Sequence, residues 1–196
     1  MMKFSYPHGA TPIDEDEASE LIPTHIYLQE ELNEYEETNI LKAASKYFVK
    51  SYKYSEILDF NFLLEVHESM FDKTWKWAGK TRNTTKNIGV DVTQIYEMTK
   101  NLCDDVKYWI ENKTYNIDEI GARFHHRLVQ IHLFPNGNGR HSRFVTDMLM
   151  RSLEQPAFTW GNKDLYHESD IRSKYISALK EADKNNYKPL FEFVKS

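Results

Sequence analysis

Apolar residues recur at spacings of three and four through most of the chain, which is the pattern of amphipathic helices. The first such segment spans about residues 28–48, and later ones follow Asp59, Asn116 and the glycines at 137 and 139. Further helices are expected over about 92–109, 170–183 and 188–195. The residues expected to face the core are Leu28, Leu32, Tyr35, Ile40, Ala43, Tyr47, Leu63, Val66, Met70, Phe71, Ile117, Ile120, Phe124, Leu128, Ile131, Phe144, Val145, Met148 and Leu149.

Residues 79–91, GKTRNTTKNIGVD, break this helical rhythm. Gly79 and Gly89 bracket a stretch rich in Thr and Asn, which predicts a short β-hairpin. Residues 1–23 are predicted to form an irregular N-terminal arm, whose acidic run 14–17 is typical of a solvated face. The pattern as a whole predicts a mainly α fold, with a single helical domain over 24–196 and one small hairpin.

Composition excludes several classes of protein. A chain of 196 residues with 40% hydrophobic and 28% charged residues can bury a core, so it is neither disordered nor a membrane protein. Its net charge, 25 − 30 = −5, argues against direct binding to nucleic acid. One cysteine, Cys103, excludes an internal disulfide framework. Neither a secretory signal nor an apolar run of about 18 residues is found, so we expect a cytoplasmic protein without membrane contact.

Candidate chemistry is concentrated in residues 131–143, IHLFPNGNGRHSR. Gly137 and Gly139 allow positive φ angles and close approach of a ligand to the backbone. A helix that begins at such a turn directs unpaired N–H groups at one point, which favours phosphate binding. Arg140 and Arg143 can reach the same anion, and His132 can titrate near neutral pH. Each feature alone fits an ordinary interhelical turn, but their fixed spacing predicts a group-transfer site.

The segment HLFPNGNGRHSR resembles the signature of the Fic (Fido) domain family, His-x-Phe-x-(Asp/Glu)-Gly-Asn-Gly-Arg-x-x-Arg, at every fixed position but one. The resemblance extends from about Gly9 to Phe193. The stretch GATPIDEDEASELIPTHIYLQEELNEYEETNI and the later FTWG look like the Fic subgroup called mobile mystery protein B. The resemblance implies a Fic-type helical bundle with a β-hairpin flap before the motif.

The resemblance also implies a function, that of a protein adenylyltransferase (AMPylase). Such a nucleotidyltransferase moves AMP from ATP, with Mg²⁺, onto a Ser, Thr or Tyr hydroxyl of a target protein. His132 would be the general base, Phe134 an anchor of the loop, and the hairpin within 80–93 the docking site of the target. The residues that the resemblance assigns to the nucleotide phosphates are Gly137, Asn138, Gly139, Arg140 and Arg143.

Asn136 is the one departure from the family signature, because Asp or Glu there helps to hold Mg²⁺. An Asn side chain offers only a neutral oxygen to the metal. The Fic relative Doc, which transfers phosphate, can carry Asn at this position but has Lys where this chain has Gly139. The full Gly-Asn-Gly-Arg sequence favours AMP transfer. A Doc-like phosphotransferase toxin and a degenerate Fic binding module controlled by an antitoxin-like partner stay open.

Two further features follow from the resemblance. The mobile mystery protein B subgroup implies an accompanying helix-turn-helix partner. Many Fic proteins are inhibited by a glutamate that pairs with the second arginine of the motif, within a (Ser/Thr)-x-x-x-Glu-(Gly/Asn) sequence. Ser177 and Glu181 have this spacing but are followed by Ala182. We therefore take Glu34 or Glu37, in the segment 28–48, as the hypothetical inhibitor acting through Arg143.

Three more polar or reactive side chains lie near the motif or on a predicted helix. His125 and His126 match no metal-binding motif, so packing and hydrogen bonding are their expected roles. Cys103, on a predicted helix, is not expected to be a nucleophile.

Overall fold

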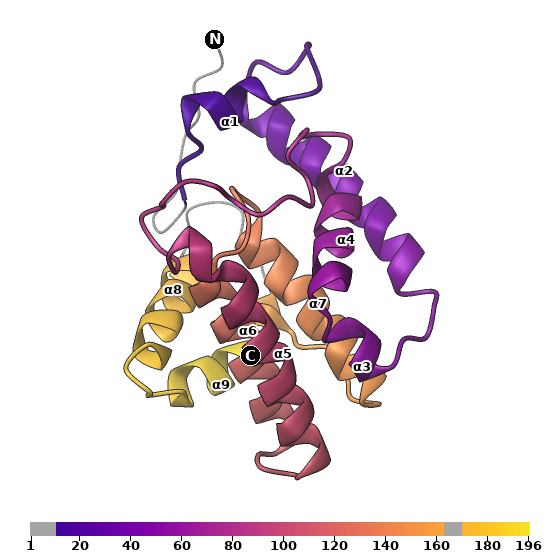
Figure 1. Ribbon diagram of the computed structural model, residues 1–196, viewed down its shortest axis with the longest axis vertical. Coiled ribbons are helices and arrows are strands. Elements are labelled where there is room, and N and C mark those ends of the chain that lie inside the picture. Colours follow the sequence, from indigo (N-terminus) through magenta and orange to yellow (C-terminus); the bar gives the residue numbers. More distant parts are fainter. Residues whose placement is uncertain (1–10, 163–169) are drawn as a thin grey trace.

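The computed structural model describes residues 11–162 and 170–196, and the first ten residues of the predicted arm lie outside this part (Figure 1). The prediction of a mainly α fold is confirmed. None of the described helices is both long and apolar enough to cross a lipid bilayer. The elements are α1 Glu15–Ser19, α2 Gln29–Tyr47, α3 Tyr54–Ile57, α4 Phe60–Phe71, η1 Val92–Gln94, α5 Ile95–Glu111, α6 Ile117–Ile131, α7 Asn138–Ser152, η2 Trp160–Asn162, α8 Asp170–Ala182 and α9 Lys188–Val194.

Two of the helices begin at side-chain caps, directly after the residues that were predicted to precede them. The Asp59 carboxylate accepts a hydrogen bond from the third residue of α4, and Asn116 Oδ1 accepts one from the backbone of Glu119 in α6. The predicted inward stripe of α6 is correct from Ile120 to Ile131, all of it buried. The prediction that Ile117 faces the core was wrong. This residue is 36% exposed, because the first turn of α6 extends beyond the core.

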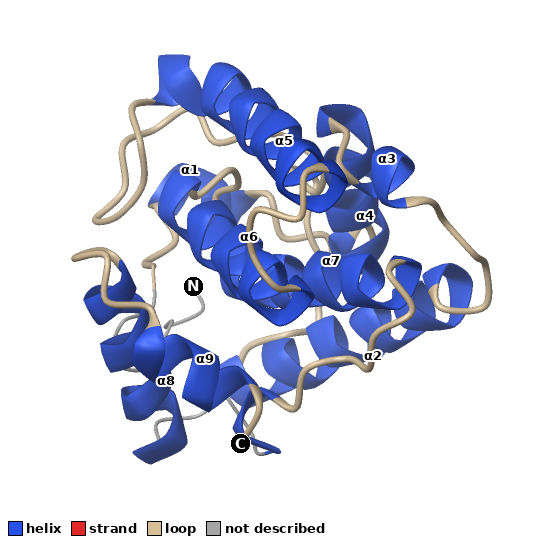
Figure 2. Cartoon of the chain, turned by 90° about the horizontal axis from the view of Figure 1, so that it is seen from below, coloured by secondary structure: helices blue, strands red, loops and turns tan. Residues whose placement is uncertain are grey.

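Helices α6 and α7 pack against each other at the centre of the molecule. Figure 2 shows α5 on one side of α6 and the α8–α9 pair on the other. The larger core lies among α2, α4, α5, α6 and α7, and a second apolar cluster lies where α8 and α9 meet α6 and α7. The connection between α6 and α7, residues 132–137, carries the candidate motif, so the two most enclosed helices position it.

The β-hairpin predicted within 80–93 does not form, because no paired strands occur in this segment. The fold is mainly α, as predicted, but without the hairpin. Residues 80–91 are a loop. The backbone N–H of Arg82 donates to the Leu133 carbonyl at 2.9 Å, and that of Val90 donates to the Ile131 carbonyl at 3.3 Å. The backbone N–H groups of both limbs of loop 80–91 therefore bond to the chain around the α6–α7 connection, and no backbone ladder joins the two limbs.

The Arg82 side chain closes the same loop from inside. Its guanidinium donates to the carbonyls of Thr84 and Val90 within the loop, and to those of Ile131 and His132 beyond it. The bond from Nε to the His132 carbonyl is 2.6 Å long, and the residue is 3% exposed. One buried guanidinium thus takes the place of the cross-strand hydrogen bonds of a hairpin.

The described part of the N-terminal arm is docked against the domain. Leu21 forms an isolated antiparallel bridge with Trp75, and α1 provides a helical turn where an irregular chain was expected. The acidic run is not simply solvated, because Asp14 and Glu17, three residues apart, share one side of α1 and both bind Lys86. The boundary at residue 23 stays a prediction.

Replacing Arg82 by Met is expected to lower the free energy of unfolding by at least about 2 kcal/mol, because buried carbonyls lose a charged donor. Urea unfolding of the variant measures this loss. Lys80→Met is the control, since it removes an exposed cation at the start of the same loop. Equal stability of the two variants would contradict the role given to Arg82.

Candidate active site

His132 ends α6 in the left-handed conformation, with φ 59° and ψ 65°. Its own N–H still bonds to the Leu128 carbonyl at 3.1 Å, while its carbonyl accepts the 2.6 Å bond from Arg82. A non-glycine residue in this region costs about 1 kcal/mol or more and is often found at functional sites. The Arg82 bond helps to hold this backbone and so orients the imidazole.

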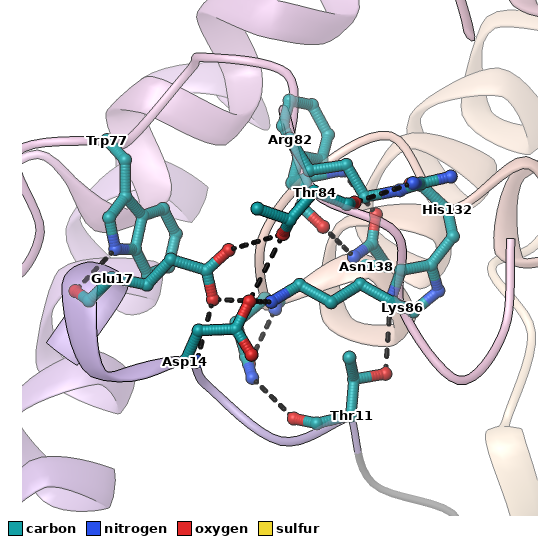
Figure 3. A network of polar contacts seen from close by, with 12 residues as sticks. Thr11, Asp14, Glu17, Trp77, Arg82, Thr84, Lys86, His132 and Asn138 are labelled. Carbon is teal, nitrogen blue, oxygen red and sulfur yellow. Dashed lines mark hydrogen bonds and ion pairs between the residues drawn. The ribbon is translucent and has the colours of Figure 1, made fainter. Parts of the chain in front are cut away.

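The His132 ring is nearly enclosed, with 4% of the residue exposed. Burial, together with the positive charges of Arg82 and Lys86, lowers the pKa of His132 to about 4. The imidazole is therefore neutral at pH 7, and one of its nitrogens keeps a lone pair. Nε2 lies 3.1 Å from Thr11 Oγ1 (Figure 3). A neutral imidazole beside a hydroxyl has the arrangement that a general base requires.

The turn after His132 is closed by side chains. Phe134 is fully buried and stacks on His67, with ring centroids 3.6 Å apart, which is the anchoring position expected for it. The Asn138 amide donates to the Phe134 carbonyl at 2.8 Å and accepts from its N–H at 2.9 Å. Because both ends of this amide are engaged, Asn138 can contribute to an anion site only through its backbone.

The two glycines of the motif have different roles. Gly137 has φ +77° and precedes α7, and a Cβ on it would lie 2.7 Å from the Phe71 ring. Gly139 lies inside α7, so the positive φ expected there was wrong. A Cβ on Gly139 would meet nothing closer than the 3.7 Å to Arg143, which leaves the helix surface open. The first turn of α7 presents backbone N–H groups that have no acceptor within the helix.

The two arginines are in different electrostatic states. Arg140 donates to Glu36 Oε2 at 2.6 Å and to Asn136 Oδ1 at 3.3 Å. Arg143 lies with its guanidinium carbon 5.7 Å from the Tyr175 ring centroid, and no carboxylate in the described ranges forms a salt bridge with it. Arg143 is therefore the arginine of the pair that forms no salt bridge with a described carboxylate.

Glu36 is the glutamate of α2 that reaches the motif. It is 4% exposed, and its other oxygen accepts from the Trp75 indole at 2.7 Å. Glu34 and Glu37 are exposed, so the structure does not place either one at Arg143. The periodicity of the helix explains why the prediction of Glu34 or Glu37 failed. The buried face of α2 passes from Leu32 through Glu36, whereas positions 34 and 37 lie to its sides.

The Asn136 side chain is engaged by neighbouring parts of the chain. Its Oδ1 accepts from the Gly137 N–H at 2.7 Å and faces the Arg140 cation. Its Nδ2 donates to the Thr11 carbonyl at 3.1 Å. In the part of the chain that the structure describes, no cluster of three or more His, Cys, Asp or Glu side chains could hold a metal ion. The Asn136 oxygen is thus already engaged by the chain, and its role as a Mg²⁺ ligand stays a prediction.

A single cavity of about 830 Å³ brings the predicted site residues together. Its wall includes the start of the described chain, α2, loop 80–91, the turn after α6, and α8. This volume lies in the range of pockets for small organic ligands, about 300–1,000 Å³. The predicted residues on the wall are His132, Asn136, Gly137, Asn138, Gly139, Arg140 and Arg143. Thr11 and Glu36 also line this cavity, although neither was predicted to belong to the site.

The neighbouring histidines have the structural roles expected of them. His125 Nε2 lies 3.0 Å from the Tyr175 hydroxyl, and His126 Nε2 lies 2.9 Å from Asp183. Burial raises the pKa of the Cys103 thiol to about 12, so this thiol is not a nucleophile at neutral pH.

A comparison of the sequence with known protein families identifies the same region of the chain. Residues 57–150 match the model of the Fic/DOC family, a range that contains loop 80–91 and the whole of the motif. The chain carries a Fic/DOC family domain. The narrower likeness to mobile mystery protein B stays a prediction.

Solved Fic structures have the same fold. The BepC effector of Bartonella tribocorum, with bound AMPPNP, is 20% identical with a TM-score of 0.68, over 93% of this chain and 97% of BepC. An N-terminal Fic domain of Bartonella quintana, with bound ADP, is 19% identical with a TM-score of 0.65, over 88% and 86% of the two chains. Fic-1 of C. elegans is 22% identical with a TM-score of 0.60, over 82% of this chain and 47% of the other. At these identities the likeness establishes the fold alone.

Alanine at the two motif glycines is expected to have opposite effects on stability. Gly137→Ala should lower the free energy of unfolding by about 2 kcal/mol or more, from backbone strain and the contact with Phe71. Gly139→Ala should leave it unchanged or raise it by up to about 1 kcal/mol, as alanine favours helix. Chemical denaturation measures both. A destabilised Gly139→Ala protein would contradict the helical placement of that residue.

Glu36→Gln is expected to destabilise the Fic domain by about 2 kcal/mol, because Arg140 keeps a partly buried charge without its carboxylate. Inorganic pyrophosphate should recover more thermal stability in this variant than in the wild type, since the arginine is then available to an anion. Glu37→Gln, one residue along and exposed, is the matched control. The Glu36 contact would be unimportant if both variants melted alike and responded alike to pyrophosphate.

Proposed function

We propose that this Fic domain is a protein adenylyltransferase, which transfers AMP from ATP to a Ser, Thr or Tyr hydroxyl of a target protein. The observation that carries the proposal is that His132 and the N-terminal turn of α7 face one cavity. Two relatives of the same fold hold AMPPNP and ADP, which supports a nucleotide as the ligand here. The assignment of ATP to this chain belongs to the proposal.

In the proposed reaction, the target hydroxyl gives its proton to Nε2 of neutral His132 and its oxygen attacks the α-phosphorus of ATP. The bond from the α-phosphorus to the oxygen bridging it to the β-phosphate breaks, and pyrophosphate leaves. The first N–H groups of α7 and the guanidinium of Arg143 stabilise the negative charge of the phosphates. Alignment of hydroxyl and phosphorus in one cavity supplies much of the remaining acceleration.

Arg140 and Asn136 restrain this activity. Phosphates that reach Arg140 have to compete with the Glu36 carboxylate, 2.6 Å from it. The need for Mg²⁺ stays a prediction from the resemblance, since Asn136 directs its oxygen to the Gly137 N–H. The neutral Asn136 also keeps a Doc-like phosphotransferase as the second candidate, and the Glu36 contact keeps a nucleotide-binding module as a third.

The target is proposed to dock along loop 80–91. Ile88, 43% exposed, and Asn87 lie on the wall of the cavity, so a chain bound to this loop would pass close to His132. The helix-turn-helix or antitoxin-like partner stays a prediction from the resemblance.

Intact-mass analysis of a cell lysate tests the transfer, after incubation with the protein, ATP and Mg²⁺. Target proteins are expected to gain the mass of an AMP moiety with the wild type and to gain nothing with His132→Ala. An added phosphate would replace the proposal by the Doc-like reaction. No addition, with ATP still bound in a calorimetric titration, would leave a binding module.

The transfer rate is expected to be independent of His132 titration between about pH 5.5 and pH 8, because its pKa is held near 4 and the base stays neutral. The rate should fall only where acid protonates this ring, as pH approaches its lowered pKa. A pH–rate profile at saturating ATP measures this. An inflection near the ordinary histidine pKa of about 6.5 would contradict a buried, neutral base.

A further inference from the structure

A hydroxyl of the chain itself already lies at the proposed base. Thr11 Oγ1 is 3.1 Å from His132 Nε2, and Thr11 is 8% exposed (Figure 3). Thr11 also lines the 830 Å³ cavity, so space for a ligand lies beside this hydroxyl. The contact joins residues 121 positions apart, so it is not a by-product of local chain geometry.

The backbone of Thr11 is held in the same place. Its carbonyl accepts from Asn136 Nδ2 at 3.1 Å, so the motif turn binds both the main chain and the side chain of this one residue. Pro12 follows directly and restricts Thr11 to extended conformations. An extended residue, held by its carbonyl with its hydroxyl on the base, has the geometry of an acceptor.

Loop 80–91 binds the chain that follows Thr11. Lys86 Nζ lies 2.7 Å from the Asp14 carboxylate and 2.6 Å from that of Glu17, and its side chain is only 3% exposed. Thr84 Oγ1 donates to Asp14 at 3.2 Å. A cation enclosed by two carboxylates is a stronger restraint than an exposed ion pair.

A further bond secures the other end of this segment, since the Trp77 indole donates to the Glu17 carbonyl at 3.2 Å. The residues from Thr11 to Glu17 therefore run along the surface where the target is proposed to dock. Their hydroxyl is placed where the target hydroxyl is required.

We propose that Thr11 is an AMP acceptor within the same molecule, so that the chain adenylylates itself at this hydroxyl. The inference rests on the proposed function. The Thr11 proton passes to His132 Nε2, Oγ1 forms a bond to the α-phosphorus of ATP, and the bond to the pyrophosphate leaving group breaks. The products are a Thr11–AMP phosphodiester and pyrophosphate, so atoms and charge balance with ATP as the only co-reactant.

Peptide mapping by mass spectrometry tests the site, on the full chain incubated with ATP and Mg²⁺. The wild type is expected to carry AMP on Thr11, and Thr11→Ser to carry it on the substituted residue. Thr11→Val, of similar shape but without the hydroxyl, should lose modification at this position. Thr38→Val is the control, because it removes an exposed hydroxyl of α2 that donates to the Glu34 carbonyl and does not contact His132. AMP found only elsewhere in the wild type would overturn the proposal.

A mixing experiment tests whether the transfer is intramolecular. The first-order rate should stay constant over a tenfold range of protein concentration. A mixture of His132→Ala protein, which keeps the acceptor, with Thr11→Val protein, which keeps the base, should label Thr11 at least tenfold more slowly than the wild type labels itself. Equal rates would show transfer between molecules and overturn the proposal.

The Lys86 contacts supply a test that leaves both reacting groups intact. Lys86→Met should slow Thr11 modification several-fold by releasing Asp14 and Glu17, while Lys80→Met, with the same loss of charge on an exposed residue of the loop, should not. Equal slowing, or none in either variant, would contradict docking through Lys86.

Failure of this proposal and failure of the proposed function give different results. Lysate proteins that gain AMP through His132 while Thr11 stays unmodified would overturn the self-modification alone. Phosphate on Thr11 would retain the acceptor and overturn AMP transfer. No modification of the chain or of any lysate protein would overturn both.

Discussion

The hydrogen bonds from the buried Arg82 guanidinium to the end of α6 are the constraint on which the site depends. They hold the His132 carbonyl while that residue adopts the left-handed conformation, and they tie loop 80–91 to the same turn. The proposed base, the proposed docking loop and the start of α7 therefore share one rigid support. The positive charge of Arg82, added to burial, also helps to keep the pKa of His132 low. A single side chain thus shapes both the geometry and the electrostatics of the cavity.

Much of the fold could be predicted because it depends on local signals. Periodic apolar residues and capping side chains such as Asp59 act within a few positions of the chain, and the helices begin near the expected residues. The motif was equally readable, since Gly137 and its neighbours are required at fixed spacing by one turn. The prediction of a hairpin was wrong because that segment depends on contacts with distant residues. Whether the two limbs of 80–91 pair with each other depends on Arg82 and on carbonyls some 50 residues away.

The long-range contacts of the site residues were not predictable from spacing, because they join distant segments. Glu36 reaches Arg140 across 104 positions, although its place on the buried stripe of α2 was visible in the periodicity. Thr11 and Lys86 carried no signal, and the acidic run 14–17 appeared as an ordinary solvated face. Together they make a cavity in which an arginine and the base are already engaged by the chain itself. Phosphates that reach Arg140 have to compete with the Glu36 carboxylate, and a foreign hydroxyl has to displace Thr11.

The central claim is that the α-phosphate of ATP, and not the γ-phosphate, is the group presented to His132. A crystal structure with a non-hydrolysable ATP analogue tests it most directly. The account predicts the α-phosphorus beside His132 Nε2 and the acceptor hydroxyl, with the outer phosphates over the first turn of α7 and near Arg143. An analogue bound with its γ-phosphate beside His132 would contradict AMP transfer and establish the geometry of a phosphotransferase.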